Sequence, residues 1–139
     1  MSNQAPVLIA EDDANDVFLL RRAFQKLGIP HPLTVVHNGQ EAIDYLNGGR
    51  SQQMYPALLL LDLKMPMLDG FDVLAWLQSN PPQQKLPVVV LTSSNQDKDI
   101  ERARTMGADE YHVKPQEFEE LIQIVDKVHQ RWLKQLPSE

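Results

Sequence analysis

Residues 57–70 read ALLLLDLKMPMLDG, and this stretch decides the fold class. Its first five residues are all apolar, which is typical of a parallel strand covered by helices on both faces. Asp62 directly follows four leucines, and a carboxylate in such surroundings is costly unless it has partners. Asp69 and Gly70 then supply turn chemistry and the start of a helix. The stretch therefore predicts a buried strand that ends in a functional carboxylate.

Similar apolar runs occur on both sides of this stretch, and amphipathic segments of helical spacing separate them. The expected strands are residues 7–10, 33–36, 57–61, 88–91 and 111–113. The expected helices begin near Asp13, Asn38, Phe71, Asp97 and Phe118. Five strand–helix units in succession predict a flavodoxin-like, doubly wound α/β domain, (βα)5, with a five-stranded parallel sheet and five flanking helices.

Local signals mark the ends of the first two helices. Asp13 is a plausible N-cap of the first helix, and Gly28 is a plausible stop. Asn38 and Glu41 have the spacing of a capping box at the start of the second helix, and the pair 48–49 (Gly-Gly) ends it. The fourth helix, 97–106, has a thin apolar stripe, so we expect it to be lightly anchored.

Length and composition exclude several classes of protein. The 139 residues contain 42% hydrophobic side chains and no cysteine, which excludes disulfides, zinc fingers and thiol chemistry. The net charge of −6 has the wrong sign for non-specific binding to nucleic acid or to an acidic membrane. We expect one cytoplasmic domain over residues 1–139, with no output domain, no nucleic-acid partner and no membrane contact.

Polar residues follow four of the expected strands. Glu11 and Asp12 come after the first strand, Asp62 after the third, Thr92 after the fourth and Lys114 after the fifth. The carboxyl ends of parallel strands meet at one crevice, so these side chains should converge. Clustered carboxylates repel one another unless a cation lies among them, and a hard divalent cation such as Mg²⁺ (or Mn²⁺) suits oxygen ligands.

This convergence favours phosphoryl chemistry. The metal would let an anionic phosphoryl group approach a carboxylate, and Asp62 at the centre is the candidate nucleophile. Lys114 would neutralise one phosphoryl oxygen, and the Thr92 hydroxyl would donate to another. Simpler interpretations remain for two residues, because Thr92 could merely end a strand and Tyr111 could be a half-buried core side chain. We interpret Asp13 as a cap, and we assign no ligand role to His31, His37, His112 and His129.

Four segments together resemble the receiver domains of response regulators. They are Glu11-Asp12-Asp13, residues 62–70 (DLKMPMLDG), Leu91-Thr92-Ser93 and Lys114-Pro115, and they occur in the family's order and spacing over essentially the whole chain. Residues 13–20, the long 48–56 loop and Leu91-Thr92-Ser93-Ser94 are most similar to stand-alone regulators. That subgroup includes cyanobacterial regulators that are paired with phytochrome-type histidine kinases.

The resemblance implies a set of roles for the strand-end residues. Asp62 would be the phosphoacceptor of a two-component phosphorelay, supplied by a histidine kinase. Glu11 and Asp12 would hold Mg²⁺ directly or through water. The carboxylate of Asp62 and the main-chain carbonyl of Lys64 would complete the protein ligands. Lys114 would assist phosphotransfer.

The resemblance also implies a switch. Thr92 and Tyr111 match the hydroxyl and aromatic positions that move together on phosphorylation, which would reshape the face of the fourth helix, fifth strand and fifth helix. A homodimer through that face is plausible. The 114–115 peptide bond (Lys-Pro) matches a family bond that is cis.

Two alternatives remain open. A metal-dependent phosphohydrolase with an aspartyl nucleophile commonly has a second aspartate two residues later as the general acid, where this chain has Lys64. A receiver-fold scaffold that is never phosphorylated would have a broken acidic site, whereas this one is complete. We expect an interaction protein that assists its own phosphotransfer and dephosphorylation rather than an enzyme.

Overall fold

The computed structural model describes residues 4–48 and 54–134, which form an α/β domain around one parallel sheet. The strands are β1 (Val7–Ala10), β2 (Leu33–Val36), β3 (Leu58–Leu61), β4 (Val88–Thr92) and β5 (Glu110–Val113). All neighbouring pairs are parallel, in the order β2-β1-β3-β4-β5. The flavodoxin-like prediction is therefore confirmed.

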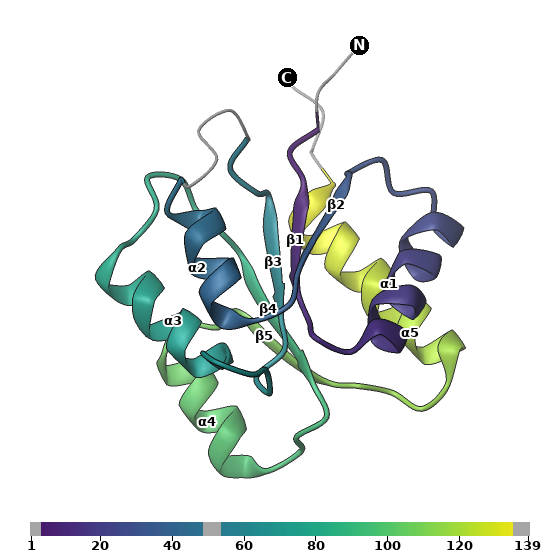
Figure 1. Cartoon of the computed structure of the whole chain (residues 1–139). Helices are drawn as coiled ribbons and strands as arrows, with labels where there is room; N and C mark the ends of the chain where they lie inside the picture. Colours follow the sequence, from purple (N-terminus) through teal and green to yellow (C-terminus); the bar gives the residue numbers. More distant parts are fainter. Residues whose placement is uncertain (1–3, 49–53, 135–139) are drawn as a thin grey trace.

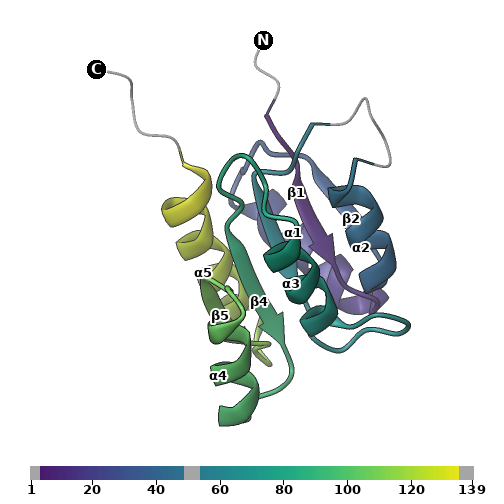
Figure 2. The same cartoon turned by 90° about the vertical axis from the view of Figure 1, so that its left-hand side faces the viewer.

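Five helices cover the two faces of the sheet. They are α1 (Ala14–Lys26), α2 (Gly39–Leu46), α3 (Gly70–Ser79), α4 (Asp97–Thr105) and α5 (Phe118–Val128). Helices α1 and α5 lie on one face, and α2, α3 and α4 lie on the other (Figure 1). Figure 2 shows α4 beside β5 at the edge of the sheet.

The leucines of β3 explain why both faces need helices. Leu58 and Leu60 pack with the apolar residues of α1 and α5, whereas Leu59 and Leu61 pack with those of α2 and α3. All four are at most 4% exposed. Successive side chains of a strand point to opposite faces, so a strand without any polar position requires a cover on each side.

The predicted helix caps are largely confirmed. The Asp13 side chain accepts a hydrogen bond from the first turn of α1, and Gly28 follows that helix with a φ of +67°. The Asn38 side chain accepts the backbone N–H of Glu41 at 2.8 Å. Glu41 reaches back one residue further than in a standard capping box, because its carboxylate accepts the N–H of His37. Of the expected 48–49 stop, the second glycine lies outside the described residues.

Helix α4 is the most weakly anchored of the five. Ala103 is its one buried residue, and its N-cap, Gln96, makes no side-chain capping bond. One contact ties it to α3, since the Arg102 guanidinium lies 4.0 Å from the centroid of the Phe71 ring. The thin apolar stripe expected from the sequence is therefore confirmed.

Two features differ from the sequence-based expectations. No cis peptide bond occurs in the described residues, so the cis prediction for the 114–115 bond is wrong. The trans form before proline is lower in energy by about 0.5–1 kcal/mol, so it is the default in the absence of a specific constraint. The chain also continues past α5 as a π-helical turn, His129–Leu133, and no sequence pattern indicated this type of helix.

Candidate functional site

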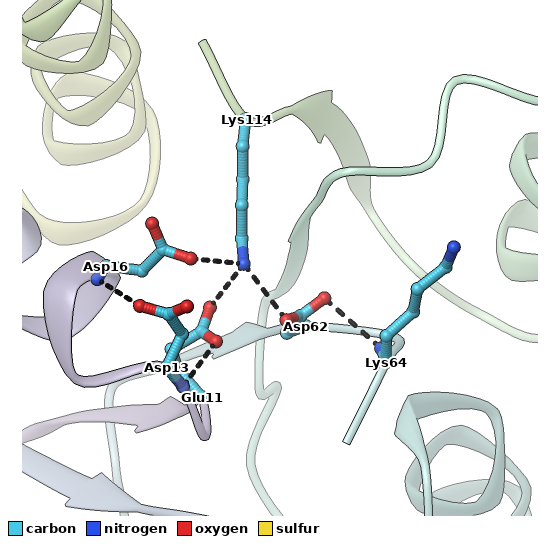
Figure 3. Close-up of polar contacts among 6 residues, drawn as sticks. All are labelled: Glu11, Asp13, Asp16, Asp62, Lys64 and Lys114. Atoms are coloured by element: carbon cyan, nitrogen blue, oxygen red, sulfur yellow. Dashed lines mark hydrogen bonds and ion pairs between the residues drawn. The ribbon is translucent and has the colours of Figure 1, made fainter. Parts of the chain in front are cut away.

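The site lies where three strands end at the same edge of the sheet. Glu11 directly follows β1, Asp62 directly follows β3 and Lys114 directly follows β5. The Lys114 Nζ lies 2.8 Å from Glu11 Oε1 and 3.0 Å from Asp62 Oδ2 (Figure 3). The strand order reverses between β1 and β3, which is where doubly wound sheets bind ligands. The predicted convergence of these three residues is thus observed.

Three carboxylates form a candidate cation site. Oxygens of Glu11, Asp12 and Asp62 all lie within 4.8 Å of one another. Glu11 and Asp62 are buried, at 3% and 5% exposure, whereas Asp12 is exposed. Such a set of hard oxygen donors suits a divalent cation that keeps several waters. The residues present therefore fit the metal that the sequence implies.

Burial dominates the electrostatics of Glu11 in this cluster, although the Lys114 ammonium group lies 2.8 Å away. Burial raises the pKa of Glu11 to about 7; the Lys114 hydrogen bond opposes this rise, and the charge of Asp62 adds to it. A carboxylate with such a pKa is partly protonated near neutrality. A divalent cation would replace that proton, so the raised pKa is itself a sign that the site fits a cation.

Lys114 is held by one more carboxylate than the sequence analysis predicted. Its Nζ donates to Asp16 Oδ2 at 2.7 Å, in addition to its contacts with Glu11 and Asp62. Burial alone would lower the pKa of Lys114, but the hydrogen bonds that it donates to Asp16 and Glu11 and the charge of Asp62 outweigh burial and raise it. Lys114 is therefore a permanent cation. Asp16 was missed because an acidic residue in the first turn of a helix has an ordinary role opposite the helix dipole.

The loop after β3 positions the carboxylate of Asp62. The backbone N–H of Lys64 donates to Asp62 Oδ1 at 3.2 Å, so its two oxygens have different partners. A Cβ added at Gly70 would lie 2.6 Å from the Asp62 carbonyl oxygen, so only glycine fits where the loop returns to α3. Met67 has a φ of +66° in this loop, an uncommon conformation for a residue with a side chain.

Thr92 ends β4 and Tyr111 lies in β5, and their hydroxyl groups are in contrasting states. Thr92 is fully buried at the end of β4, and its hydroxyl has no hydrogen-bond partner within the described part of the chain. Tyr111 is partly buried against the core, and its hydroxyl donates to the Ser94 carbonyl at 2.9 Å. The Ser94 hydroxyl donates in turn to Asp99 at 2.6 Å, which ties the loop to α4. Hydrogen bonds through Ser94 thus link the Tyr111 hydroxyl to α4, whereas the Thr92 hydroxyl has no partner in the described residues.

The comparisons with known proteins agree with this geometry. The family model of the response regulator receiver domain matches residues 7–126. The chain belongs to this family. It is a response regulator of the two-component type. No helix in residues 4–48 or 54–134 has the length and apolar character required to cross a bilayer.

Two curated relatives cover most of this receiver domain. The probable methanogenesis regulatory protein FilR2 of Methanothrix harundinacea is 37% identical over 131 residues, which are 91% of this chain and 83% of that protein. The response regulator Rcp1 of Synechocystis is 31% identical over 129 residues, covering 91% of this chain and 88% of that protein.

Solved structures extend the likeness to the fold of the whole chain. The phosphorylated cyanobacterial phytochrome response regulator RcpA superposes with a TM-score of 0.86 at 33% identity, covering 97% of this chain and 99% of that one. The Mn²⁺-bound form of Rcp1 superposes with a TM-score of 0.84 at 28% identity and the same coverage. A receiver of this fold therefore binds a divalent metal, and another carries a phosphoryl group.

Proposed function

We propose that this receiver accepts a phosphoryl group on Asp62 from a histidine kinase and signals through a surface that the phosphoryl group reshapes. The observation that carries the proposal is a buried carboxylate held between a lysine and an acidic pair. Asp62 is 5% exposed, has Lys114 at 3.0 Å and lies in the carboxylate cluster with Glu11 and Asp12. A structural role explains such a residue poorly, because buried charges of like sign destabilise the fold.

The chain's own residues divide the transfer among them. One oxygen of Asp62 attacks phosphorus, the bond from phosphorus to the donor nitrogen breaks, and an aspartyl phosphate forms. Lys114 neutralises an oxygen of the transferred group throughout, since its raised pKa keeps it charged. Bound Mg²⁺, or Mn²⁺, would lower the repulsion between the donor and the site. Its ligands would be Glu11, Asp12, Asp62 and the main-chain carbonyl of Lys64.

The same geometry supports a switch that begins at Thr92. A buried hydroxyl without a partner gains a hydrogen bond if a phosphoryl oxygen arrives within reach. Movement of Thr92 toward Asp62 would alter the adjoining β4–α4 loop. The hydrogen bond from the Tyr111 hydroxyl to the Ser94 carbonyl would change with that loop. Because α4 buries only one residue, its displacement costs little. The face of α4, β5 and α5 is therefore the proposed signalling surface.

The partners follow from this assignment. A histidine kinase would donate the phosphoryl group, and the likeness to the phytochrome response regulator RcpA supports a phytochrome-type kinase. The receiver would act in the cytoplasm. A homodimer through the α4–β5–α5 face is part of the same proposal. Val113 of β5 is 40% exposed and gives that face an apolar contact point.

The phosphohydrolase alternative finds less support. The residue two positions after the acceptor is Lys64, whose side chain is exposed and cannot act as a carboxylic general acid. Autodephosphorylation by water would still occur, so slow self-hydrolysis is compatible with the receiver role. A scaffold role would leave the acidic cluster without a purpose.

Intact-mass measurement tests the proposal directly. The wild type, Asp62→Asn and the control Asp44→Asn would be incubated with Mg²⁺ and acetyl phosphate, and separately with a phosphorylated histidine kinase. We expect one base-labile phosphoryl group on the wild type and the control, and none on Asp62→Asn. An adduct that persists on Asp62→Asn would show a different acceptor. No adduct on the wild type from either donor would reject phosphorylation.

A further inference from the structure

Lys114 has three carboxylate partners in the described structure, and one of them differs from the other two. Glu11 and Asp62 belong to the carboxylate cluster, whereas Asp16 does not. Asp16 nevertheless makes the shortest contact, with its Oδ2 2.7 Å from the lysine Nζ (Figure 3). It comes from the first turn of α1, 98 residues away from Lys114 along the chain.

This difference matters once the site holds a divalent cation and a phosphoryl group. A divalent cation would compete with Lys114 for the oxygens of Glu11 and Asp62, and a phosphoryl group would occupy one of the two oxygens of Asp62. Asp16 lies outside the carboxylate cluster, so it is the partner of the three that a bound cation would leave undisturbed. Its position is also fixed, because its backbone N–H donates to the Asp13 side chain at 3.0 Å as part of the helix cap.

We propose that Asp16 is a positioning residue that holds the Lys114 ammonium group over the acceptor oxygen of Asp62 during phosphotransfer. This inference rests on the proposed function of Asp62. Lysine carries its charge on a flexible four-carbon stem, so it contributes fully to transfer only if its position is fixed. Asp16 acts through Lys114 and makes no contact with the reacting atoms.

The negative charge of Asp16 and its hydrogen bond with Lys114 should have opposite effects on the rate of phosphorylation. Asp16 is an anionic group near the approach of an anionic donor, so removal of its charge alone would speed the reaction. Loss of the hydrogen bond alone would slow it. Asp16→Asn removes the charge and keeps an oxygen that accepts from the lysine, whereas Asp16→Ala removes both. The positioning role therefore predicts that these two variants behave differently.

The first measurement is the rate of phosphorylation by acetyl phosphate at saturating Mg²⁺, with the Mg²⁺ affinity measured in parallel. We expect Asp16→Ala to react roughly tenfold more slowly and Asp16→Asn to stay within about threefold of the wild type. Both should keep the wild-type Mg²⁺ affinity, because Asp16 lies outside the carboxylate cluster. Glu119→Ala, which removes an exposed carboxylate from the first turn of α5, is the matched control and should react normally.

A double-mutant cycle separates positioning from a structural effect. If Asp16 acts through Lys114, then Asp16→Ala should cause no further slowing in a Lys114→Ala background. Equal slowing in both backgrounds, or a wild-type rate for a well-folded Asp16→Ala, would overturn the inference. Failure of the wild type to accept a phosphoryl group would instead reject the proposed function.

A second readout needs no phosphorylation. In the Mg²⁺-loaded protein, proton exchange at the Lys114 ammonium group can be followed by ¹H–¹⁵N NMR, with the signal assigned from its absence in Lys114→Ala. We expect a slowly exchanging ammonium signal in the wild type and in Asp16→Asn, and rapid exchange in Asp16→Ala. Unchanged exchange in Asp16→Ala would contradict the positioning role even if its reaction rate fell.

Discussion

Glu11, which is buried, and Glu110, which is partly buried, lie at opposite ends of the sheet and have opposite electrostatic environments. Glu11 follows the carboxyl end of β1 among other carboxylates, and burial raises its pKa to about 7. Glu110 begins β5, and its side chain is 10% exposed. It accepts hydrogen bonds at 2.7 Å from Arg131 and from the Trp132 indole, and it contacts His112 at 2.9 Å. Burial alone would raise the pKa of Glu110, but these partners outweigh burial and lower it.

The difference separates a charge that the chain itself neutralises from a charge that the chain leaves partly uncompensated. A carboxylate whose partners are supplied by the chain is stable as an anion and contributes to stability. A carboxylate that shares one lysine with two other acids is left short of positive charge. Glu110 therefore has the environment of a structural group, whereas the environment of Glu11 suits a cation. Residue type and burial alone do not distinguish the two.

The largest expected effect is on metal affinity. Glu11→Gln should weaken Mg²⁺ binding by about a hundredfold, since even the loss of groups that only support metal ligands costs 10–100-fold. Glu110→Gln removes the same charge at the other end of the sheet and should leave Mg²⁺ affinity unchanged. Isothermal titration calorimetry measures both. Similar losses in the two variants would mean that Mg²⁺ responds to net charge and not to this site.

The second effect is a pH dependence of stability in the metal-free protein. The pKa of Glu11 in the folded chain, about 7, exceeds its ordinary value of 4.5, so the folded state binds the proton more tightly. Its contribution to stability is present below pH 4.5 and is lost as the pH rises to about 7. The free energy of unfolding in EDTA should therefore fall over this interval by on the order of 2 kcal/mol.

Urea unfolding across that interval checks the sign. Excess Mg²⁺ or Glu11→Gln should flatten the profile, because each removes the proton-binding difference between the folded and unfolded states. Glu110 acts in the other direction, since its lowered pKa gives stability that is lost only as the pH falls below its ordinary range. A rise in stability from pH 4.5 to about 7 in EDTA would contradict the environment assigned to Glu11.

The sequence could predict the end of the sheet where chemistry occurs. Strand periodicity places Glu11, Asp62 and Lys114 directly after three parallel strands, and parallel strands leave their carboxyl ends at one edge. Backbone topology alone brings these residues together, whatever the helices do. Thr92 was placed for the same reason, because it ends β4. The fold and the central residues were therefore accessible without a structure.

Contacts made by helices could not be predicted in this way. Asp16 reaches Lys114 from the first turn of α1, and the position of that helix depends on its packing against α5. Arg131 and Trp132 both reach Glu110 from a π-helical turn. A regular α-helix would have placed these two adjacent side chains about 100° apart, so no pattern of 3.6-residue spacing indicates that they share an acceptor.

A third effect should appear when the charge of Glu110, whose hydrogen-bond partners the chain supplies, is removed. Glu110→Gln keeps an oxygen for the Trp132 indole but loses the charge that strengthens its hydrogen bonds, so we expect destabilisation by about 1–2 kcal/mol. Glu11→Gln should have the opposite sign in EDTA, because it relieves repulsion from Asp62. Urea unfolding of both variants at neutral pH measures the contrast. Destabilisation of both by similar amounts would mean that Glu11 is also a structural group.

The smallest expected quantity is the difference in stability between two variants that each remove one partner of Glu110. Arg131 is 61% exposed and contacts the carboxylate from the solvent side, so Arg131→Ala should cost only about 0.5 kcal/mol. Trp132 is partly buried, and Trp132→Phe keeps much of its apolar bulk while removing a donor to a charged group, which costs about 1.5 kcal/mol or more. Unfolding curves for the two variants should therefore differ, with the indole as the stronger partner. If Arg131→Ala were the more damaging change, the low pKa of Glu110 would depend on the guanidinium charge, and high salt should then destabilise the wild type.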